Sequence, residues 1–160
     1  MAEIIALPDL KKVRSWIEDV SEELEVIDMC DLECDGVSAV ISMIFRRCGI
    51  DHKVFTGFVR DNQEDCLIFP HVWLELDLPL KYIVDIRLKN CIEGYEQDSY
   101  GIEIPNGVFR ARDIPKRFDY IRSGQINFDE FSESEFEILT EGKYSEIKLP
   151  RTPSSRQLKI

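Results

Sequence analysis

The feature that most constrains the fold is a change in apolar periodicity at Gly49. Before it, residues 35–48 carry apolar side chains at helical spacing, and Gly49 is a natural helix stop. After it, three segments are rich in β-branched and aromatic residues: HKVFTGFV (52–59), HVWLEL (71–76) and KYIVDIRL (81–88). Such residues favour strands. The sequence therefore predicts a central helix followed by three strands.

Weaker elements are expected on either side. Residues 8–25 predict a first helix that begins at Pro8, and EVIDMCDLEC is expected to connect it to Cys34. Residues 60–70 are expected to form a polar surface loop, and LDLPL (76–80) a hairpin connection. In the last third we expect short strands in GIEIP and GVFRARDIP, and a short helix or turn in KRFDYIRSG. A peripheral helix is expected in FDEFSESEFEIL, followed by a flexible or surface-bound tail after residue 150. We expect one domain over residues 1–160, with a dense core over 30–88 and residues 89–160 adding strands, a helix and the tail.

The composition of the chain limits the classes of partner that it is expected to bind. The chain has a net charge of −11 and a pI near 4.7, which disfavours nucleic acid and anionic membranes as partners. It has no apolar run of membrane-spanning length and no secretory signal, so a cytoplasmic location is expected. The cysteines are odd in number and predict reduced thiols. Cys30 and Cys34 lack a second Cys/His pair, so neither a metal nor a cofactor is expected.

Three residues have side chains that could act together in catalysis. Cys34 stands where the central helix should start, His71 begins one predicted strand, and Asp85 lies in the next. A thiol, an imidazole and a carboxylate can form a nucleophile, its base and the group that orients the base. Unpaired N–H groups in the first turn of a helix favour a thiolate. Each residue also has a plain structural interpretation: a buried thiol, a strand-end histidine, and an outward-facing aspartate.

The predicted hairpin gives this hypothesis a geometric form. If antiparallel strands pair residue 76 with residue 80, they also pair His71 with Asp85. Directly opposed residues share a face, with Cβ atoms roughly 4.5–5.5 Å apart. A slip of one residue would place the two side chains on opposite faces.

Several short motifs also occur together and in order. The stretches CDGVSAVISMIFRRCGIDHKVFTGFV, HVWLEL and YIVDIR resemble the transglutaminase-like core of the papain-like cysteine enzymes over about residues 30–88. The matching positions are Cys34, Ser38, Gly49 with Ile50, Gly57 with Phe58, His71 with Trp73 and Glu75, and Asp85. Lasso-peptide leader peptidases are similar around RRCGIDHKVFTGFV and HVWLEL, although their core lies near the end of the chain.

The resemblance implies an α+β fold in which the cysteine-bearing helix packs on an antiparallel sheet that carries His and Asp. It implies a Cys34–His71–Asp85 triad acting through a thioester on a protein or peptide substrate, with Trp73 contacting that substrate. Transfer to water gives a peptidase, amidase or deamidase, which we favour, and transfer to an amine gives transglutaminase-type crosslinking. A secreted effector that modifies host glutamines is a narrower version of the same interpretation.

Other features leave alternatives open. The oxyanion donor is expected to be Trp16 or a backbone N–H near Glu33 and Cys34. Cys30 is a possible second thiol near Cys34, and His52 is expected to be exposed and without a chemical role. A non-enzymatic interaction module on the same fold is the alternative function, with residues 129–141 (acidic) or 110–122 (basic) as the partner-binding surface.

Overall fold

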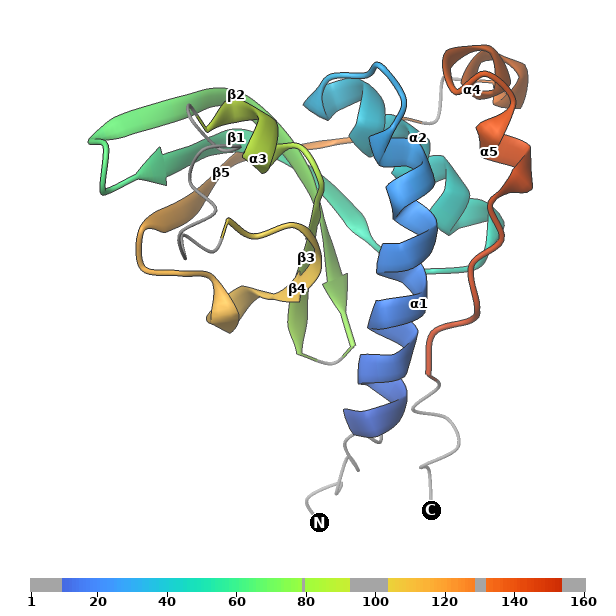
Figure 1. The fold of residues 1–160 in the computed structure, drawn as a ribbon, viewed down its shortest axis with the longest axis horizontal. Coiled ribbons are helices and arrows are strands. Elements are labelled where there is room, and N and C mark those ends of the chain that lie inside the picture. Colours follow the sequence, from blue (N-terminus) through green and yellow to red (C-terminus); the bar gives the residue numbers. More distant parts are fainter. Residues whose placement is uncertain (1–9, 79, 93–103, 129–131, 154–160) are drawn as a thin grey trace.

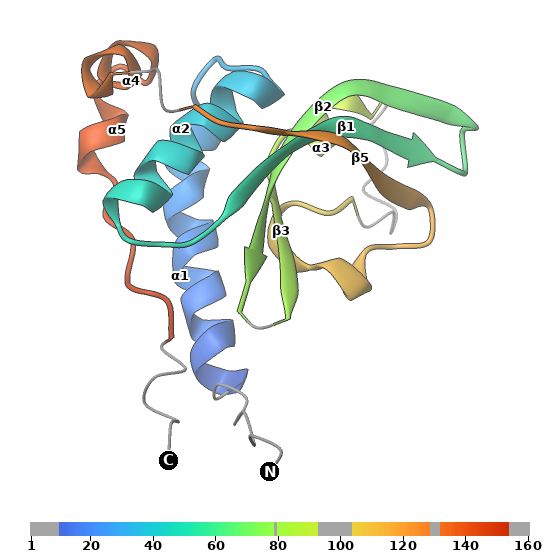
Figure 2. The ribbon, with the colours of Figure 1, turned by 180° about the vertical axis from the view of Figure 1, so that it is seen from behind.

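The chain folds into a helical layer packed against an antiparallel sheet. The computed structural model describes residues 10–78, 80–92, 104–128 and 132–153, and its two layers are seen from opposite sides in Figures 1 and 2. The fold is therefore α+β, as expected. The helices are α1 (Leu10–Asp28), α2 (Cys34–Arg47), α3 (Leu88–Cys91), α4 (Glu133–Leu139) and α5 (Lys143–Glu146), with a 3-10 turn at Ala111–Asp113. The strands are β1 (Lys53–Asp61), β2 (Cys66–Asp77), β3 (Lys81–Asp85), β4 (Gly107–Arg110) and β5 (Phe118–Ile126).

Helix α1 runs one turn further than predicted. The segment expected to be a connection is helical as far as Asp28, because Val20, Leu24 and Ile27 continue the apolar spacing and all three are buried. The connection to α2 is therefore short. Residues 8 and 9 of the predicted helix lie outside the described residues.

Helix α2 confirms the central prediction to within one residue. It begins at Cys34, and its buried face includes Val37, Val40 and Ile44. Gly49 has a φ of +72°, the left-handed conformation that ends a helix at low cost when the residue is glycine. The turn at Gly49 leads directly into β1.

The sheet has the order β4-β3-β2-β1-β5, with every neighbouring pair antiparallel. The loop predicted over residues 60–70 is wrong for most of its length. Strand β1 continues to Asp61 and β2 begins at Cys66, which leaves only a tight turn over residues 62–65. Pro70, which has no N–H, lies where the β1–β2 register shifts, so the ladder tolerates it.

The β2–β3 hairpin forms, but its register differs from the predicted one by two residues. Asp77 pairs with Lys81 and Leu74 with Val84, so His71 and Asp85 are not directly opposite. Side chains alternate with a period of two, so a slip of two residues leaves both on the same face. Apolar alternation satisfies either register equally and cannot distinguish them.

The C-terminal third contains the largest correction. The segment expected to be a short helix or turn is strand β5, which pairs along β1. Gly57 allows this close approach, because a Cβ there would lie 2.0 Å from the carbonyl oxygen of Ile121. The short strand expected in GVFRARDIP is confirmed as β4, and the peripheral helix is confirmed as α4. The strand expected in GIEIP is absent at Ile104 and Pro105, and the first three residues of that segment lie outside the described residues. Residues 129–131 and 154–160 also lie outside them.

The main core lies between helices α1 and α2 and the side of the sheet that faces them. Trp16, Phe45 and Leu74 are among its buried members. On the other side of the sheet, Phe55, Trp73 and Ile83 form a smaller cluster. Across the described ranges, none of the helices combines the length and apolar character that a bilayer crossing requires.

Candidate active site

His71 and Asp85 form a buried hydrogen-bonded pair. The Nε2–H of His71 donates to Oδ2 of Asp85 over 2.7 Å, and both side chains are almost fully buried. His71 comes from the middle of β2, and Asp85 is the last residue of β3. The two-residue offset makes them diagonal neighbours, a spacing that these side chains bridge.

Asp85 is held by three further donors. Its Oδ1 accepts the backbone N–H groups of Arg87 (2.9 Å) and Leu88 (3.1 Å), and its Oδ2 also accepts the hydroxyl of Tyr120 (2.7 Å). These bonds satisfy the carboxylate at the point where β3 ends and α3 begins. A carboxylate with this many donors is stabilised in its charged form.

The pair is electrostatically coupled. Burial alone would lower the pKa of His71, but the carboxylate of Asp85 outweighs it and raises the pKa of His71 to about 12. Burial likewise opposes the charge on Asp85, but His71 and the hydrogen bonds lower the pKa of Asp85. The two shifts are opposite in direction and both favour the charged form, so they describe an imidazolium–carboxylate pair at neutral pH.

The second ring nitrogen of His71, Nδ1, is the one that can interact with a thiol. Nδ1 is buried and makes no hydrogen bond of ordinary geometry among the described residues. The thiols of Cys34 and Cys91 nonetheless lie near enough for hydrogen bonding to raise the pKa of His71 further. With Nε2 engaged by Asp85, Nδ1 is the atom through which His71 can exchange a proton with a thiol.

Cys34 begins α2, at the edge of this pair. Its Sγ lies 3.9 Å from the carbonyl oxygen of Pro70, the residue before His71, and the side chain is half-buried. Helix α2 packs on β2, the strand that carries His71 (Figure 1). The structure therefore brings all three predicted residues into one region.

Arg87 joins the two segments that carry the site. It is buried, and its guanidinium donates to the carbonyl oxygens of Leu32 (2.7 Å) and Cys30 (2.9 Å) and to the carboxylate of Asp28. Its own backbone N–H bonds Asp85. One residue thus fixes the connection that delivers Cys34 relative to the strand end that delivers Asp85.

Trp73 does not offer a surface to a substrate. It is fully buried, it contacts the ring of Tyr120 edge-to-face at 5.1 Å, and its Nε1–H donates to Glu75. Glu75 also pairs with Arg122, which stacks over Phe55. The expected substrate contact of Trp73 is therefore replaced by a packing role beneath the histidine.

The remaining candidates occupy other places. The indole N–H of Trp16 donates to the carbonyl oxygen of Pro150, so it is not available as an oxyanion donor. The thiol of Cys30 lies against the carbonyl oxygens of Val26 and Thr140, and burial raises its pKa. His52 was expected to be exposed, but it is half-buried and both of its ring nitrogens are hydrogen-bonded.

Tyr120, Arg87 and Cys91 are the site residues that the sequence did not reveal. Tyr120 was missed because its segment was assigned to a helix or turn; the alternation of Phe118, Tyr120 and Arg122 in FDYIRSGQI was the available strand signal. Arg87 follows Asp85 by two residues, but nothing local predicts its contacts with the α1–α2 connection.

Comparison of the chain with models of protein families, with curated proteins and with solved structures finds no match. In the described part of the chain, no three side chains of metal-binding type are grouped to hold an ion.

Proposed function

We propose that the protein is a cysteine-dependent acyl-transfer enzyme that cleaves a carboxamide or peptide bond through a thioester. The observation that carries the proposal is the buried 2.7 Å contact between His71 and Asp85, which leaves Nδ1 for the thiol of Cys34. The resemblance of residues 30–88 to the transglutaminase-like core supports the same reaction class. The substrate is a protein or peptide in this proposal, and hydrolysis is the favoured outcome.

The first half-reaction uses His71 as a proton carrier. His71 rests as an imidazolium held by Asp85, the Cys34 thiol releases its proton to solvent, and the Nδ1–H of His71 stabilises the resulting thiolate. The sulfur attacks the carbonyl carbon and forms a tetrahedral intermediate. Nδ1–H then donates its proton to the leaving amine, the C–N bond breaks, and the acyl group remains on sulfur.

The second half-reaction reverses these roles. Neutral His71 removes a proton from water or from an acceptor amine, whose oxygen or nitrogen attacks the thioester carbonyl. The C–S bond breaks and regenerates the thiolate beside the imidazolium. The first half-reaction is common to peptidases, amidases and transglutaminases, so the triad defines the reaction class and the acceptor must be measured.

The oxyanion requires a donor near Cys34. The Trp16 indole is occupied by Pro150, so the remaining candidate is a backbone N–H at the start of α2. Such groups point out of the first turn and carry the positive end of the helix dipole. In the proposal, the N–H of Cys34 fills this position.

The decisive experiment is the pH dependence of alkylation at each cysteine. Purified protein is treated with iodoacetamide between pH 5.5 and 7.5, and the modified residues are quantified by mass spectrometry. A thiolate held by an imidazolium reacts at a nearly constant rate over this range. A free thiol, with a pKa near 8.5, slows roughly tenfold per pH unit. We expect the flat profile at Cys34 and the steep one at the exposed Cys66.

Matched variants separate the residues. His71→Ala and Asp85→Asn should convert Cys34 to the steep profile, and His52→Ala, which removes the other histidine, should not. Cys91 also lies near His71, so Cys91→Ser should leave the Cys34 profile flat. A steep profile at Cys34 in the wild-type protein, or a flat one only at Cys91, would falsify the proposal.

A second measurement tests acyl transfer itself. p-Nitrophenyl acetate is a small activated ester that acylates reactive thiols without specific substrate contacts. Intact-mass and peptide-mass analysis should find a single acetyl group on Cys34 that depends on His71. Release that is accelerated by added putrescine, but not by tert-butanol, identifies an amine acceptor; release independent of both identifies water.

A further inference from the structure

The first half of β2 exposes two large apolar side chains. Leu67 is 57% exposed and Phe69 is 69% exposed. Ile68, between them, packs against a small apolar cluster that includes Phe118. Because side chains of a strand alternate between its two faces, Leu67 and Phe69 lie on the face away from that cluster. A single exposed apolar side chain is ordinary, but two on one strand face form a surface that a partner can cover.

The two side chains lie on the face of the sheet that α2 covers. Val54 of β1 belongs to the main core beneath the helices, and Arg60 is six residues further along the same strand. Alternation therefore puts Arg60 on the same face as Val54, and Arg60 pairs with Leu67. The exposed apolar surface thus continues the face on which α2 packs.

This surface ends at the nucleophile. Phe69 is followed by Pro70, whose carbonyl oxygen lies 3.9 Å from Sγ of Cys34. One turn further along α2, the hydroxyl of Ser38 donates to the carbonyl oxygen of Val72 over 3.2 Å. The first turns of α2 therefore lie over residues 70–72, and β2 continues past the beginning of the helix (Figures 1 and 2). We call this uncovered segment, residues 66–70, the β2 arm.

The other side of Cys34 is acidic. Asp31 and Glu33 are exposed in the connection that leads into α2, and Asp35 is exposed in its first turn. Asp35 accepts the backbone N–H of Gly36 over 2.8 Å, but none of the three carboxylates forms an ion pair with any described residue. Three carboxylates without a cation create a local negative potential, which attracts the basic residues of a partner.

We propose that the β2 arm and the acidic connection are two halves of a docking surface for a polypeptide with an apolar side chain on one side of Cys34 and basic residues on the other. The apolar side chain covers Leu67 and Phe69, and the basic residues lie against Asp31 and Glu33. That this polypeptide is a substrate rests on the proposed function, whereas docking itself requires no catalysis. A second copy of the chain is a poorer match for the surface, because two copies with a net charge of −11 repel each other.

A two-by-two set of peptides tests both halves of the surface. Four fluorescein-labelled peptides share the frame Gly-X-Gly-Gln-Gly-Z-Z-Gly, in which X is Phe or Ser and Z is Lys or Glu. Their anisotropy is measured with Cys34→Ser, which lacks the thiol and reports binding alone. Exchange of Phe for Ser should weaken binding at least about fivefold, because an apolar contact is lost. Exchange of Lys for Glu should weaken it at least about threefold at low salt, and added salt should reduce that difference.

Variants on the Cys34→Ser background assign the apolar half. Leu67→Ser with Phe69→Ser should remove the preference for the Phe peptides and keep the preference for the Lys peptides. Ile138→Ser changes another exposed apolar residue, on α4, and should leave both preferences unchanged. Circular dichroism of each variant confirms that a lost preference belongs to a folded protein.

The acidic half is assigned in the same way. Asp31→Asn with Glu33→Gln should remove the preference for the Lys peptides and keep the preference for the Phe peptides. Glu18→Gln with Asp19→Asn neutralises two exposed acids of α1 and is the matched control for net charge. This control should retain both preferences.

Protection from alkylation locates the bound peptide. In the wild-type protein, the Phe/Lys peptide should slow the reaction of Cys34 with iodoacetamide, whether the peptide stays intact or acylates the thiol. It should not slow the reaction of Cys48, which lies at the other end of α2.

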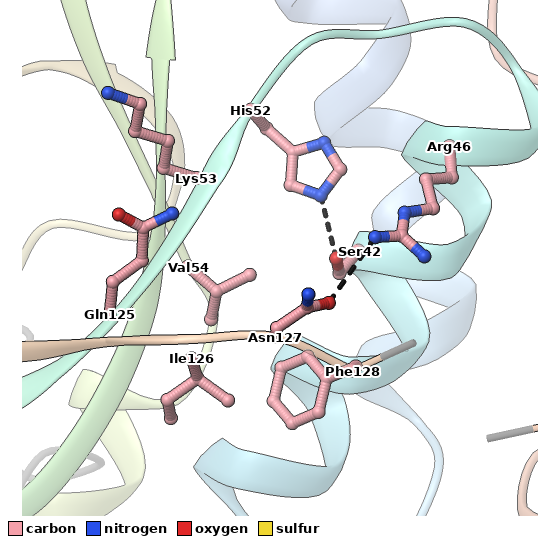
Figure 3. Close-up of a pocket in the computed structure, with 9 residues that line it drawn as sticks. All are labelled: Ser42, Arg46, His52, Lys53, Val54, Gln125, Ile126, Asn127 and Phe128. Carbon is pink, nitrogen blue, oxygen red and sulfur yellow. Dashed lines mark hydrogen bonds between the residues drawn. The ribbon is translucent and has the colours of Figure 1, made fainter. Parts of the chain in front are cut away.

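The cavity beside that end of α2 provides a second control. His52 lines it, and the Nδ1–H of His52 donates to the carbonyl oxygen of Ile50, so Nε2 accepts the Ser42 hydroxyl over 2.6 Å (Figure 3). Ser42 is eight residues from Cys34, which is roughly 12 Å along the helix axis. A peptide docked at Cys34 should therefore leave the ring NMR signals of His52 unchanged.

Three results overturn the proposal. They are equal binding of the Phe/Lys and Ser/Glu peptides, preferences that survive in both double variants, and self-association of the wild-type protein that Leu67→Ser with Phe69→Ser abolishes, which assigns the arm to a second copy. Any of these with a flat pH profile at Cys34 removes the docking surface and leaves the proposed function. Protection of Cys34 by the Phe/Lys peptide together with a steep profile supports the docking surface and removes the catalysis.

Discussion

The two histidines of this chain occupy opposite electrostatic environments. His71 is fully buried against the Asp85 carboxylate, which raises the pKa of His71 to about 12. His52 is half-buried between the Ser42 hydroxyl and a backbone carbonyl, and burial lowers its pKa. The same ring is therefore a cation in one region and a neutral acceptor in the other. Burial favours the neutral ring at both positions, so the neighbouring carboxylate makes the difference.

The largest expected difference between the two regions is in stability. His71→Ala leaves the Asp85 carboxylate buried without its cation, which should lower the free energy of unfolding by about 3–5 kcal/mol. His52→Ala removes two neutral hydrogen bonds of a half-buried side chain, where water can replace them, and should cost about 1 kcal/mol. Urea unfolding at pH 7 measures both. Equal costs would mean that the charged pair adds nothing beyond its hydrogen bonds.

The pH dependence of stability is the next largest effect. The folded pKa of His71 lies above its unfolded value of about 6.5, so the native state binds an extra proton between pH 6.5 and about 12. The stabilisation is complete below pH 6.5 and is lost as pH rises through that window. In Asp85→Asn, burial keeps the ring neutral and this dependence disappears. The advantage of the wild-type protein over Asp85→Asn should therefore shrink on the order of 1 kcal/mol per pH unit above 6.5.

His52→Ala is the control for that titration. The pKa of His52 is lowered, so this ring has already lost its proton above pH 6.5. The difference between wild type and His52→Ala should stay constant from pH 6.5 to 9.5. A constant difference for Asp85→Asn over the same range would contradict the imidazolium assignment of His71.

The sequence predicted the parts of the site that depend on helical or strand periodicity. It did not predict the parts that depend on contacts between residues far apart in the chain. Helical spacing placed Cys34 at the start of α2, and strand alternation placed His71 and Asp85 on one face. The two-residue error in register was undetectable, because both registers bury the same apolar residues. Tyr120 and Arg87 reach the site through pairing and contacts across 35 and 55 residues or more, which no local pattern encodes.

The central strands also show why the loop over residues 60–70 was predicted wrongly. Residues 62–65 are polar and do form a turn, but Cys66, Leu67 and Ile68 pair with β1 although Leu67 is exposed. The polar residues that begin the segment favoured a surface loop over its whole length. Tertiary pairing with β1 overrides that local preference, and the shift in register at Pro70 lets the ladder tolerate a residue without an N–H.

Tyr120→Phe tests the support beneath the charged pair. The hydroxyl donates to Oδ2 of Asp85 over 2.7 Å, and a hydrogen bond to a buried charged group contributes about 1.5 kcal/mol or more. The ring contact with Trp73 at 5.1 Å should survive, so the cost reports the hydroxyl alone. Tyr144→Phe removes a longer bond of 3.3 Å to Glu133 and should cost under about 0.5 kcal/mol. Similar losses of stability in the two variants would show that the Tyr120 hydroxyl does not support the charged pair.

Ser42→Ala produces the smallest expected change and defines the neutral histidine most directly. The variant loses the hydroxyl that donates to Nε2 of His52, but alanine is the better helix former by roughly 0.5 kcal/mol, so the net cost should be within about 1 kcal/mol. The bond from Nδ1 to the Ile50 carbonyl remains and should preserve the tautomer, which ¹⁵N chemical shifts of the ring report. A switch of the proton to Nε2 would show that Ser42, rather than Ile50, sets the tautomer. In that case Nε2 of His52 would be a donor rather than an acceptor, whereas the pair of His71 and Asp85 would be unaffected.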